Sequence, residues 1–448
     1  MTDHRTTAAT LLGLDPALLS VLLLVGTFVI LLSGRINRTV VALLGAGLVV
    51  LSGVLSQQQA IAGVDFNTIG LLTGMMIIVA ITRLTGLFEL VAIRAVQLVR
   101  GDPRGVLIVL SMVTAVFSAF LDNLTTVLLV VPIVMLIVDK LELSPYPFLV
   151  SQILCSNIGG TATLIGDPPN ILIGSATGYG FADFLVNLGP LVLLLLLLTV
   201  VLQYLFVGRS LQSSAENRER VMRFRAADSI QDVRLLRYSL LVLGGVIGGF
   251  LLGEHAGIRP GTVAMFGAAL LLFLSGFGRD AEFQGQRVRE AFMEVEWGAL
   301  FFFMGLFVLV AGVEHTGVLG VLGERLLDAT DGEPRSTSYA VLWLAALVST
   351  AIDNIPFVTT MIPLVESMEG RLGGAAAVEP IWWSLALGAC LGGNGSLIGA
   401  AANVMVAGLS ERAGYPLSFL GFLRVGLPVM LGTVAMAHGY LYLRFFSG

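Results

Sequence analysis

Apolar stretches long enough to cross a lipid bilayer recur along almost the whole chain. A helix needs about 20 apolar residues to cross the ~30 Å hydrocarbon core of a membrane. Candidate spans of this kind occupy residues 17–33, 39–54, 67–84, 184–207, 236–253, 260–277, 295–313 and 419–443. Only 12% of the 448 residues are charged and 56% are hydrophobic, whereas soluble domains are about 25% charged. We therefore expect an all-α, polytopic membrane protein that is not an enzyme.

Four further apolar runs are interrupted by polar residues. Residues 106–138 and 339–368 contain a central Asp-Asn pair, and residues 147–174 and 381–408 contain glycine-rich polar clusters. Lipid offers no partner to the backbone groups that a broken helix exposes, so these segments must face protein or a water-filled cavity. The interruptions therefore indicate the working part of the molecule.

The interruptions form an internal repeat. Asp122 is followed ten residues later by a proline, and Asp353 is followed by a proline at the same spacing. The glycine-rich run that starts at Gly159 recurs at Gly392, at a constant offset of 233 residues. Paired, interrupted apolar segments at corresponding places in two halves are typical of transporters built from inverted repeats, and they indicate the binding site.

We predict two inverted repeats of about five transmembrane helices each, residues 17–207 and 236–448. A basic loop, residues 208–235, joins them, and a lead, residues 1–16, precedes them. With this span count, 19 of the 25 basic residues fall on one face, which the positive-inside rule makes cytoplasmic. The protein is then expected in the cell inner membrane with both termini in the periplasm. Residues 86–100 are expected to form an amphipathic helix on the membrane surface.

Asp122 and Asp353 are acids within apolar runs, where an Asp costs roughly 2.5 to 3.5 kcal/mol on insertion scales and usually has a function. Neighbouring amide and hydroxyl groups complete the two candidate clusters: Asn123, Thr125 and Thr126 in the first half, and Asn354 and Thr359 in the second. Such groups are ligands for a cation, a proton or a polyhydroxylated solute. The alternative is that each Asp only caps the helix that follows it.

The glycine-rich clusters add further candidate binding residues. These are Asn157, Gly159, Gly160, Thr161, Asp167 and Asn170 in the first half, and Asn394, Gly395, Ser396 and Asn403 in the second. Pro168 and Pro169 have no amide proton, and the glycines allow close backbone approach, so each cluster predicts a broken helix. The second half has three alanines in place of Asp167, Pro168 and Pro169. Asp167 is therefore a third candidate carrier of a proton or ion, with a helix cap as the alternative.

Cys155 and Cys390 directly precede the two glycine-rich clusters. A thiol can bind a soft metalloid, but two small residues in apolar surroundings are better explained as buried packing residues. The sequence contains no third thiol and no phosphate-binding loop. We expect no cofactor, no structural metal site and no ATP hydrolysis by this chain.

These motifs resemble the ion transporter superfamily, within its arsenite and sodium permease branch, which includes ArsB, NhaD and the melanosomal P protein. The most specific matches are Asp122 to Pro132, Ser156 to Asn170, Ile352 to Phe357 and Gly388 to Gly395. The resemblance implies re-entrant helical hairpins at residues 106–138 and 339–368. It also implies a fixed scaffold, a moving transport domain and elevator-like alternating access.

The resemblance leaves three substrate classes open. These are export of arsenite and antimonite driven by the proton gradient, Na⁺/H⁺ antiport, and symport of carboxylates. No Arg or Lys lies within the interrupted segments near the acids, which argues against a dianion, whereas neutral As(OH)₃ suits amides and hydroxyls. We expect arsenite efflux, and hence arsenical resistance, first and Na⁺/H⁺ antiport second; an ion channel is least expected. The expected partners are the lipid bilayer, the small substrate and protons. A cytoplasmic ATPase partner and a homodimer are left open. No nucleic acid is expected to bind.

Overall fold

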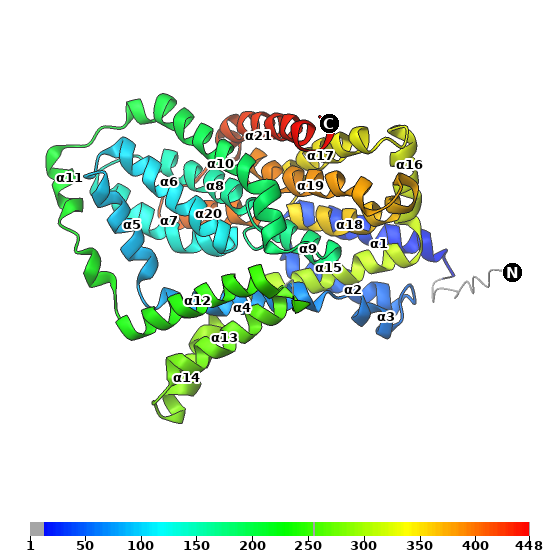
Figure 1. The fold of residues 1–448 in the computed structure, drawn as a ribbon, viewed down its shortest axis with the longest axis horizontal. Coiled ribbons are helices and arrows are strands. Elements are labelled where there is room, and N and C mark those ends of the chain that lie inside the picture. Colours follow the sequence, from blue (N-terminus) through cyan, green and yellow to red (C-terminus); the bar gives the residue numbers. More distant parts are fainter. Residues whose placement is uncertain (1–12, 254–255, 448) are drawn as a thin grey trace.

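The computed structural model of the protein describes residues 13–253 and 256–447, and every regular element in these ranges is a helix (Figure 1). Nine of these described helices are long and apolar enough to cross a membrane. They are α1 (Pro16–Ser33), α4 (Phe66–Arg83), α6 (Pro103–Phe120), α7 (Asn123–Lys140), α10 (Phe181–Phe206), α12 (Val233–Gly253), α15 (Trp297–His315), α19 (Ala375–Gly392) and α21 (Phe419–Leu441). The predicted all-α membrane fold is confirmed. Residues 1–12 of the predicted lead lie outside the described ranges.

The helices of the second half follow those of the first half in the same order, α1 to α10 corresponding to α12 to α21. The remaining members are α2 (Arg38–Leu51), α3 (Gln57–Ala62), α5 (Leu87–Leu98), α8 (Tyr146–Gly160), α9 (Pro168–Thr177), α13 (Pro260–Gly276), α14 (Ala281–Met293), α16 (Val318–Ala329), α17 (Pro334–Ala351), α18 (Asn354–Leu372) and α20 (Ala401–Arg412). This order agrees with the repeat that the sequence predicts.

Each interrupted run of the sequence forms a pair of helices. In the first hairpin, α6 and α7 are joined at residues 121–122, and in the second hairpin, α17 and α18 are joined at residues 352–353. The first break, residues 161–167, separates α8 from α9, and the second break, residues 393–400, separates α19 from α20. The helices α6 and α7 each have 18 residues and are candidate spans by length. A hairpin either crosses the membrane twice or enters and leaves it on the same side. In both cases the following helix begins on the same side of the membrane.

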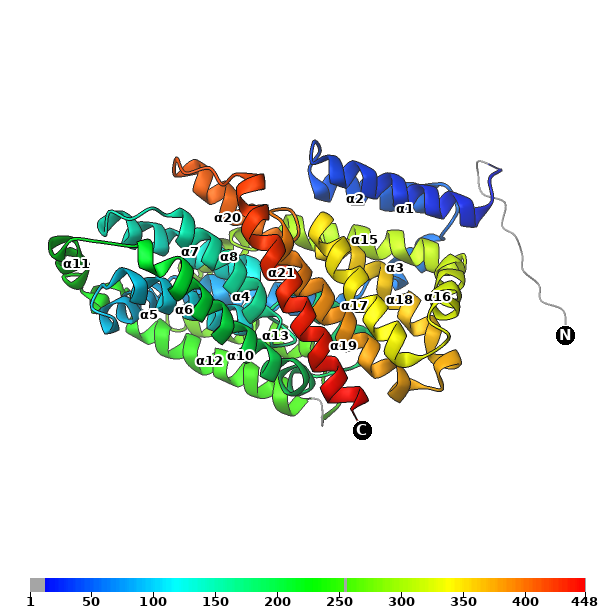
Figure 2. The same ribbon diagram turned by 90° about the horizontal axis from the view of Figure 1, so that it is seen from above.

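The two halves interlock through α4 against α13 and α2 against α15. A Cβ at Gly74 of α4 would lie 2.5 Å from the carbonyl carbon of Ala264, and a Cβ at Gly305 of α15 would lie 2.7 Å from that of Ala42. Small residues at such crossings let helices in a membrane approach closely. The same contact thus occurs twice, once from each half, and it fixes how the two repeats align. In Figure 2, α1 and α2 run along one edge of the molecule, with α15 next to them.

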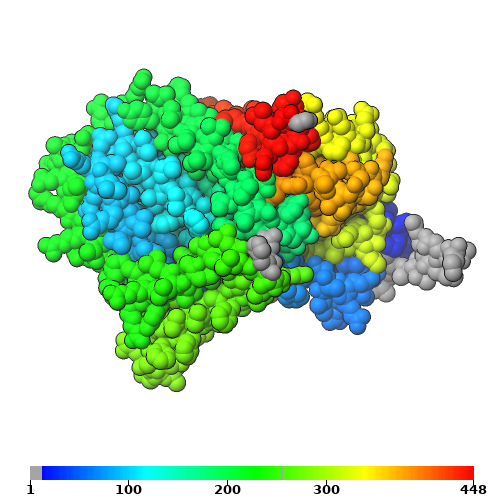
Figure 3. All heavy atoms as spheres, in the orientation of Figure 1, coloured from blue at the N-terminus to red at the C-terminus, as the bar shows by residue number. Residues whose placement is uncertain are grey.

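Short helices extend the fold beyond the predicted spans. The surface helix expected at residues 86–100 is α5, which buries Phe88, Ala92 and Val96 and leaves Leu98 83% exposed. Its counterpart α16 and the helix α14, which projects from the body in Figures 1 and 3, were not predicted, because neither is long and apolar enough to be read as a span.

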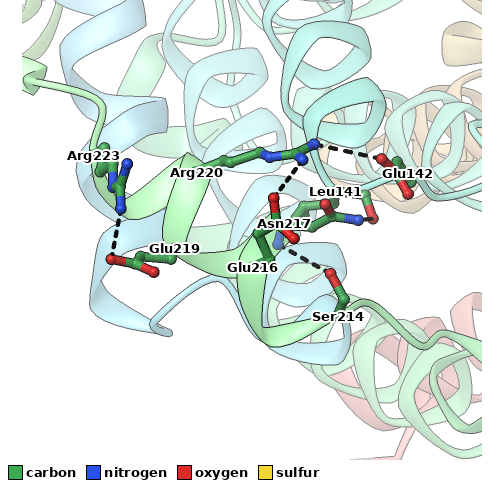
Figure 4. A network of polar contacts seen from close by, with 8 residues as sticks. All are labelled: Leu141, Glu142, Ser214, Glu216, Asn217, Glu219, Arg220 and Arg223. Carbon is green, nitrogen blue, oxygen red and sulfur yellow. Dashed lines mark hydrogen bonds and ion pairs between the residues drawn. The ribbon is translucent and has the colours of Figure 1, made fainter.

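The predicted basic loop forms a strap over the base of the first hairpin, at the outer edge of the molecule (Figures 1 and 4). It contains α11 (Ala215–Met222), from which Asn217 Nδ2 donates to the Leu141 carbonyl at 3.5 Å. Arg220 pairs with Glu142 at 3.5 Å and with Glu216 at 2.7 Å. Exposed ion pairs contribute only about 0 to 1 kcal/mol each. The strap is therefore held by several weak contacts rather than by one strong one.

The predicted topology can be tested with single cysteines at Arg220 and Arg335, which are both exposed. The background replaces the buried Cys155 and Cys390 with Ala. An impermeant maleimide should label Arg335→Cys in intact cells and Arg220→Cys only in everted vesicles, because the positive-inside count puts them on opposite faces. Labelling of both from one side would mean that the span count of one half is wrong.

Candidate functional site

The two hairpins and the two breaks meet in the interior, and each break lies against the hairpin of its own half. The backbone N–H of Asn123 donates to the Gly166 carbonyl at 3.0 Å, which joins the first hairpin to the first break. In the second half, the Ser396 hydroxyl donates to the Thr350 carbonyl at 2.5 Å. Backbone groups that the helix interruptions expose are thus satisfied by protein, as expected for irregular chain at membrane depth.

Three of the predicted glycines have a packing role. A Cβ at Gly159 would lie 2.3 Å from the Ala115 carbonyl oxygen of the first hairpin, and a Cβ at Gly160 would lie 2.5 Å from the Gly166 carbonyl oxygen. In the second half, a Cβ at Gly395 would lie 2.3 Å from the Thr350 hydroxyl. Only glycine allows these approaches. The three residues therefore allow the hairpins and breaks to pack closely, and the side chains around them are the candidates for binding.

Asn157 joins the two halves at the centre of the candidate site. Its Oδ1 accepts from Asn123 Nδ2 at 3.3 Å. Its Nδ2 donates to Asn394 Oδ1 at 3.1 Å and to Asn403 Oδ1 at 2.9 Å. All four side chains are at most 3% exposed. The Asn157 amide therefore connects α8 to the first hairpin, to the second break and to the start of α20.

Asn170 and Asn403 also hold the two breaks in shape, in equivalent ways. Asn170 Nδ2 donates to the carbonyls of Thr161 and Thr163 at 3.1 and 2.8 Å. Asn403 Nδ2 donates to the carbonyls of Gly393 and Ser396 at 2.7 and 2.8 Å. Both amides are fully buried. The repeated asparagine therefore satisfies backbone oxygens that the broken helices leave free.

Asp167 lies in the same cluster and is fully buried. Its Oδ1 accepts from Asn354 Nδ2 of the second hairpin at 3.3 Å, and its carboxyl group also interacts with Asn123 and Cys390. Within the described residues, its Oδ2 and the Nδ2 of Asn394 have no hydrogen-bond partner. Its side chain forms no cap bond to α9, so the alternative of a helix cap does not account for this acid.

The acids at the two hairpin tips do form helix caps. Asp122 Oδ1 accepts from the Thr125 N–H at 2.8 Å, and the Thr125 hydroxyl donates to Asp122 Oδ2. Asp353 Oδ1 accepts from the Ile355 N–H at 3.2 Å. The capping alternative is therefore realised at both tips, without excluding a second role for either carboxylate. Of the predicted threonines, Thr359 donates to the Ile355 carbonyl, whereas the buried Thr126 hydroxyl has no partner among the described residues.

Arg38 is a site residue that sequence reasoning missed. One of its guanidinium nitrogens lies 3.1 Å from Asp353 Oδ2, in a cavity of about 540 Å³ that also borders Leu124 and Ile398. Arg412 lines the same cavity, and both arginines belong to the face that the charge count makes cytoplasmic. A smaller cavity of about 220 Å³ reaches Thr359 and borders Arg259, which the same count assigns to the opposite face.

The two cysteines have separate surroundings. Cys390 Sγ donates to Asn170 Oδ1 at 3.5 Å, and Cys155 Sγ accepts from Gln203 Nε2 at 4.0 Å. Both thiols are buried and free. In the part of the chain that the structure describes, no group of three or more His, Cys, Asp or Glu side chains is arranged to hold a metal ion.

Two repeated halves whose hairpins and broken helices meet at buried polar side chains define a membrane transporter. Comparison with known families agrees with this class. The family model described as "Citrate transporter" (CitMHS) matches residues 28–388. The chain belongs to this family.

The chain is also similar to individual proteins of bacteria and mammals. An uncharacterized transporter of Mycobacterium tuberculosis is 40% identical over 435 residues, which cover 96% of this chain and 99% of that protein. The human P protein is 33% identical over 500 residues, which cover 94% of this chain and 59% of the P protein. The YdaH transporter of Alcanivorax borkumensis shares the fold with a TM-score of 0.60 at 12% identity, covering 96% of this chain and 98% of that one.

These comparisons confirm the predicted similarity to the P protein. They confirm the transporter class and a multi-pass integral membrane protein as well, and they do not assign the chain to the arsenite and sodium permease branch. The substrate and the role of each candidate residue stay predictions.

Proposed function

We propose that the protein is a proton-coupled secondary transporter in which Asp167 carries the coupling cation. What supports this is the position of Asp167: a fully buried carboxylate between the two hairpin tips, whose Oδ2 has no hydrogen-bond partner among the described residues. An uncompensated acid inside a membrane protein is costly and typically belongs to a proton or ion pathway. The second repeat has Ala400 at the equivalent place, so only one such carrier is present.

The substrate proposed is a small uncharged hydroxide, arsenite or antimonite, which the protein exports. The buried amides around Asn157 can donate and accept hydrogen bonds without a counter-charge. The family description names citrate, an anion at neutral pH. Three aspartates lie at the candidate site, and the cavity beside Asp353 is also lined by Glu296 and by two arginines, Arg38 and Arg412. This excess of negative charge favours a neutral substrate over an anion.

Na⁺/H⁺ exchange is the second candidate function, and one observation favours it. Carboxylate and amide oxygens are hard ligands of the kind that suit alkali cations, and Asp167 Oδ2 is such an oxygen without a partner among the described residues. In this version Na⁺ and H⁺ would compete for Asp167, and no metalloid would be carried.

The transport cycle proposed is elevator-like alternating access. The cavity beside Arg38 reaches Asp353 from one face, and the smaller cavity beside Arg259 reaches Thr359 from the other. Movement of the hairpins and breaks against α1, α2, α4 and their counterparts would expose the site to each face in turn. This cycle needs neither a cytoplasmic ATPase partner nor a homodimer.

Flux in everted inner-membrane vesicles with an imposed pH gradient tests the proposal. Arsenite and antimonite should accumulate as the gradient is consumed, and citrate should not. Replacing Cys155 and Cys390 together with Ala should leave the initial rate within about twofold, because a thiol is only a weak hydrogen-bonding group and Ala is similarly small. Na⁺-dependent proton movement without arsenite flux would favour the exchanger, and citrate accumulation would reject both candidates.

A further inference from the structure

We propose that Arg38 is a tethered cation that occupies the place of a coupling cation at the tip of the second hairpin, so that this tip binds no mobile cation in the transport cycle. The proposal rests on the proposed function of the site and adds a coupling stoichiometry to it. It concerns a residue outside all four interrupted segments.

The internal repeat by itself predicts two equivalent acidic tips. Asp122 and Asp353 are 231 positions apart, and each caps the second helix of its hairpin through Oδ1. If each tip presented a free carboxylate to its cavity, each could bind one coupling cation. A symmetric transporter of this design would therefore couple one cation at each tip, in addition to the one proposed at Asp167.

Within the described ranges, a guanidinium pairs with the carboxylate of only one of the tips. Arg38 lies 3.1 Å from Asp353 Oδ2, and its Cζ lies 5.3 Å from the centroid of the Phe302 ring. The two side chains of the ion pair are 37% and 20% exposed and line the same cavity of about 540 Å³. An ion pair on one side and a cation-π contact on the other hold the positive charge where a bound cation would neutralise Asp353.

The surroundings of the two tips differ at three linked positions. The paired contacts of Gly305 with Ala42 and of Gly74 with Ala264 align α2 with α13 and α15 with α4. In this alignment, the positions equivalent to Arg38 and Phe302 are Pro260 and Leu71. The third position is Thr125, whose hydroxyl satisfies Asp122 in the first hairpin; its equivalent in the second hairpin is Pro356, which has no donor. The two carboxylates are thus satisfied by different means, a hydroxyl at one tip and a cation at the other.

A tethered cation excludes a mobile one. Among the described residues, Asp122 forms no ion pair, whereas the charge of Asp353 is cancelled by Arg38. A group held on the chain competes at an effective concentration in the millimolar range or above, and it cannot leave with the substrate. The uncompensated negative charge, from Asp122 and Asp167, therefore lies on the side of the first hairpin and the first break.

The stoichiometry can be measured in proteoliposomes with the membrane potential clamped at zero. The slope of the logarithm of the substrate accumulation ratio against the imposed pH difference gives the number of protons per substrate. We expect the slope for Arg38→Gln to exceed that of the native chain by about 1, since each carrier that titrates at a coupled site adds one proton. Arg38→Lys, which keeps the cation, should keep the native slope, and so should the matched control Arg35→Gln, an exposed arginine in the loop that precedes α2.

A binding measurement separates this proposal from the proposed function. Purified protein is titrated with NaCl at constant ionic strength, with choline as the replacement, and the unfolding midpoint is recorded. Arg38→Gln should gain a steeper rise of the midpoint with the logarithm of Na⁺ concentration, and adding Asp353→Asn should remove the gain. An unchanged slope in both assays, or a gain that survives Asp353→Asn, would overturn the role of Arg38. Failure of the proposed function would appear instead as full coupled transport by an Asp167 variant.

Discussion

Replacing Asp167 with Asn is expected to abolish proton-coupled transport while leaving a folded protein in the membrane. Asn keeps the size of the side chain and the Oδ1 acceptor that receives Asn354 Nδ2 at 3.3 Å, but it cannot carry a proton or a charge. The expected loss of coupled flux is at least about a hundredfold, the scale on which a positioned proton carrier acts. Initial rates in proteoliposomes with an imposed pH gradient measure it.

The unfolding midpoint of the same variant should be equal to or higher than that of the native chain, because an uncompensated buried charge is removed. Asp139→Asn is the matched control, since Asp139 is exposed at the base of the first hairpin and should transport normally. Coupled flux in Asp167→Asn within a few-fold of the native rate would reject Asp167 as the carrier. A lowered midpoint together with lost flux would mean that Asp167 has a structural role.

The sequence indicated which acids matter but not how each is used. Asp122 and Asp353 stand out because an acid within an apolar run is unusual, and Asp167 stands out between glycines and prolines. The caps at the tips follow from local sequence, since an Asp followed by a free backbone N–H two or three residues later is a common helix start. The surroundings of the Asp167 carboxylate depend instead on a distant residue, because its Oδ1 accepts from Asn354, 187 positions away in the chain. No local pattern encodes that contact.

Arg38 could not be predicted for the same physical reason. It belongs to the start of α2, where a basic residue on the cytoplasmic side of a span is ordinary. Its ion pair joins residues 315 positions apart, and it forms only because α2 packs against α15 of the other half. The fold class, the hairpins and the breaks were predictable, because apolar length and its interruptions are properties of contiguous sequence.

The repeat explains why the candidate site lies between the halves. Each half contributes one tip and one break, and the tip packs on its own break through backbone bonds such as that from Asn123 N–H to Gly166. The contacts between halves are made by side chains instead: Asn157 to Asn394 and Asn403, and Asn354 to Asp167. These side-chain contacts hold the tips and breaks of both halves together, so we expect them to move as one body against α1, α2, α4 and their counterparts.

Replacing Asn157 with Ala is expected to weaken both transport and stability, because three buried hydrogen bonds are lost together, two of which join the halves. The change leaves buried groups of Asn123, Asn394 and Asn403 without their partner. An unsatisfied buried group costs about 1 to 3 kcal/mol, so we expect a loss of at least about 3 kcal/mol in the free energy of unfolding and more than about tenfold in transport. The unfolding midpoint in detergent and the initial rate of flux measure the two effects.

Two comparisons separate binding from structure in this prediction. Asn187→Ala is the matched control, because Asn187 lies outside the four interrupted segments. Its Nδ2 donates to the Asp183 carbonyl at 3.0 Å and its Oδ1 accepts from Arg444 at 3.3 Å, so this change should lower stability but leave transport intact. Asn157→Asp keeps the oxygen that accepts from Asn123 but replaces the donor to Asn394 and Asn403, so it should be closer to Ala than to the native residue. In a double-mutant cycle, Asn157→Ala and Asn403→Ala should cost clearly less together than the sum of the single changes, since they share one bond. Additive losses would mean that the bond at 2.9 Å between Asn157 and Asn403 contributes little to stability. This junction would then not be what holds the two halves together at the candidate site.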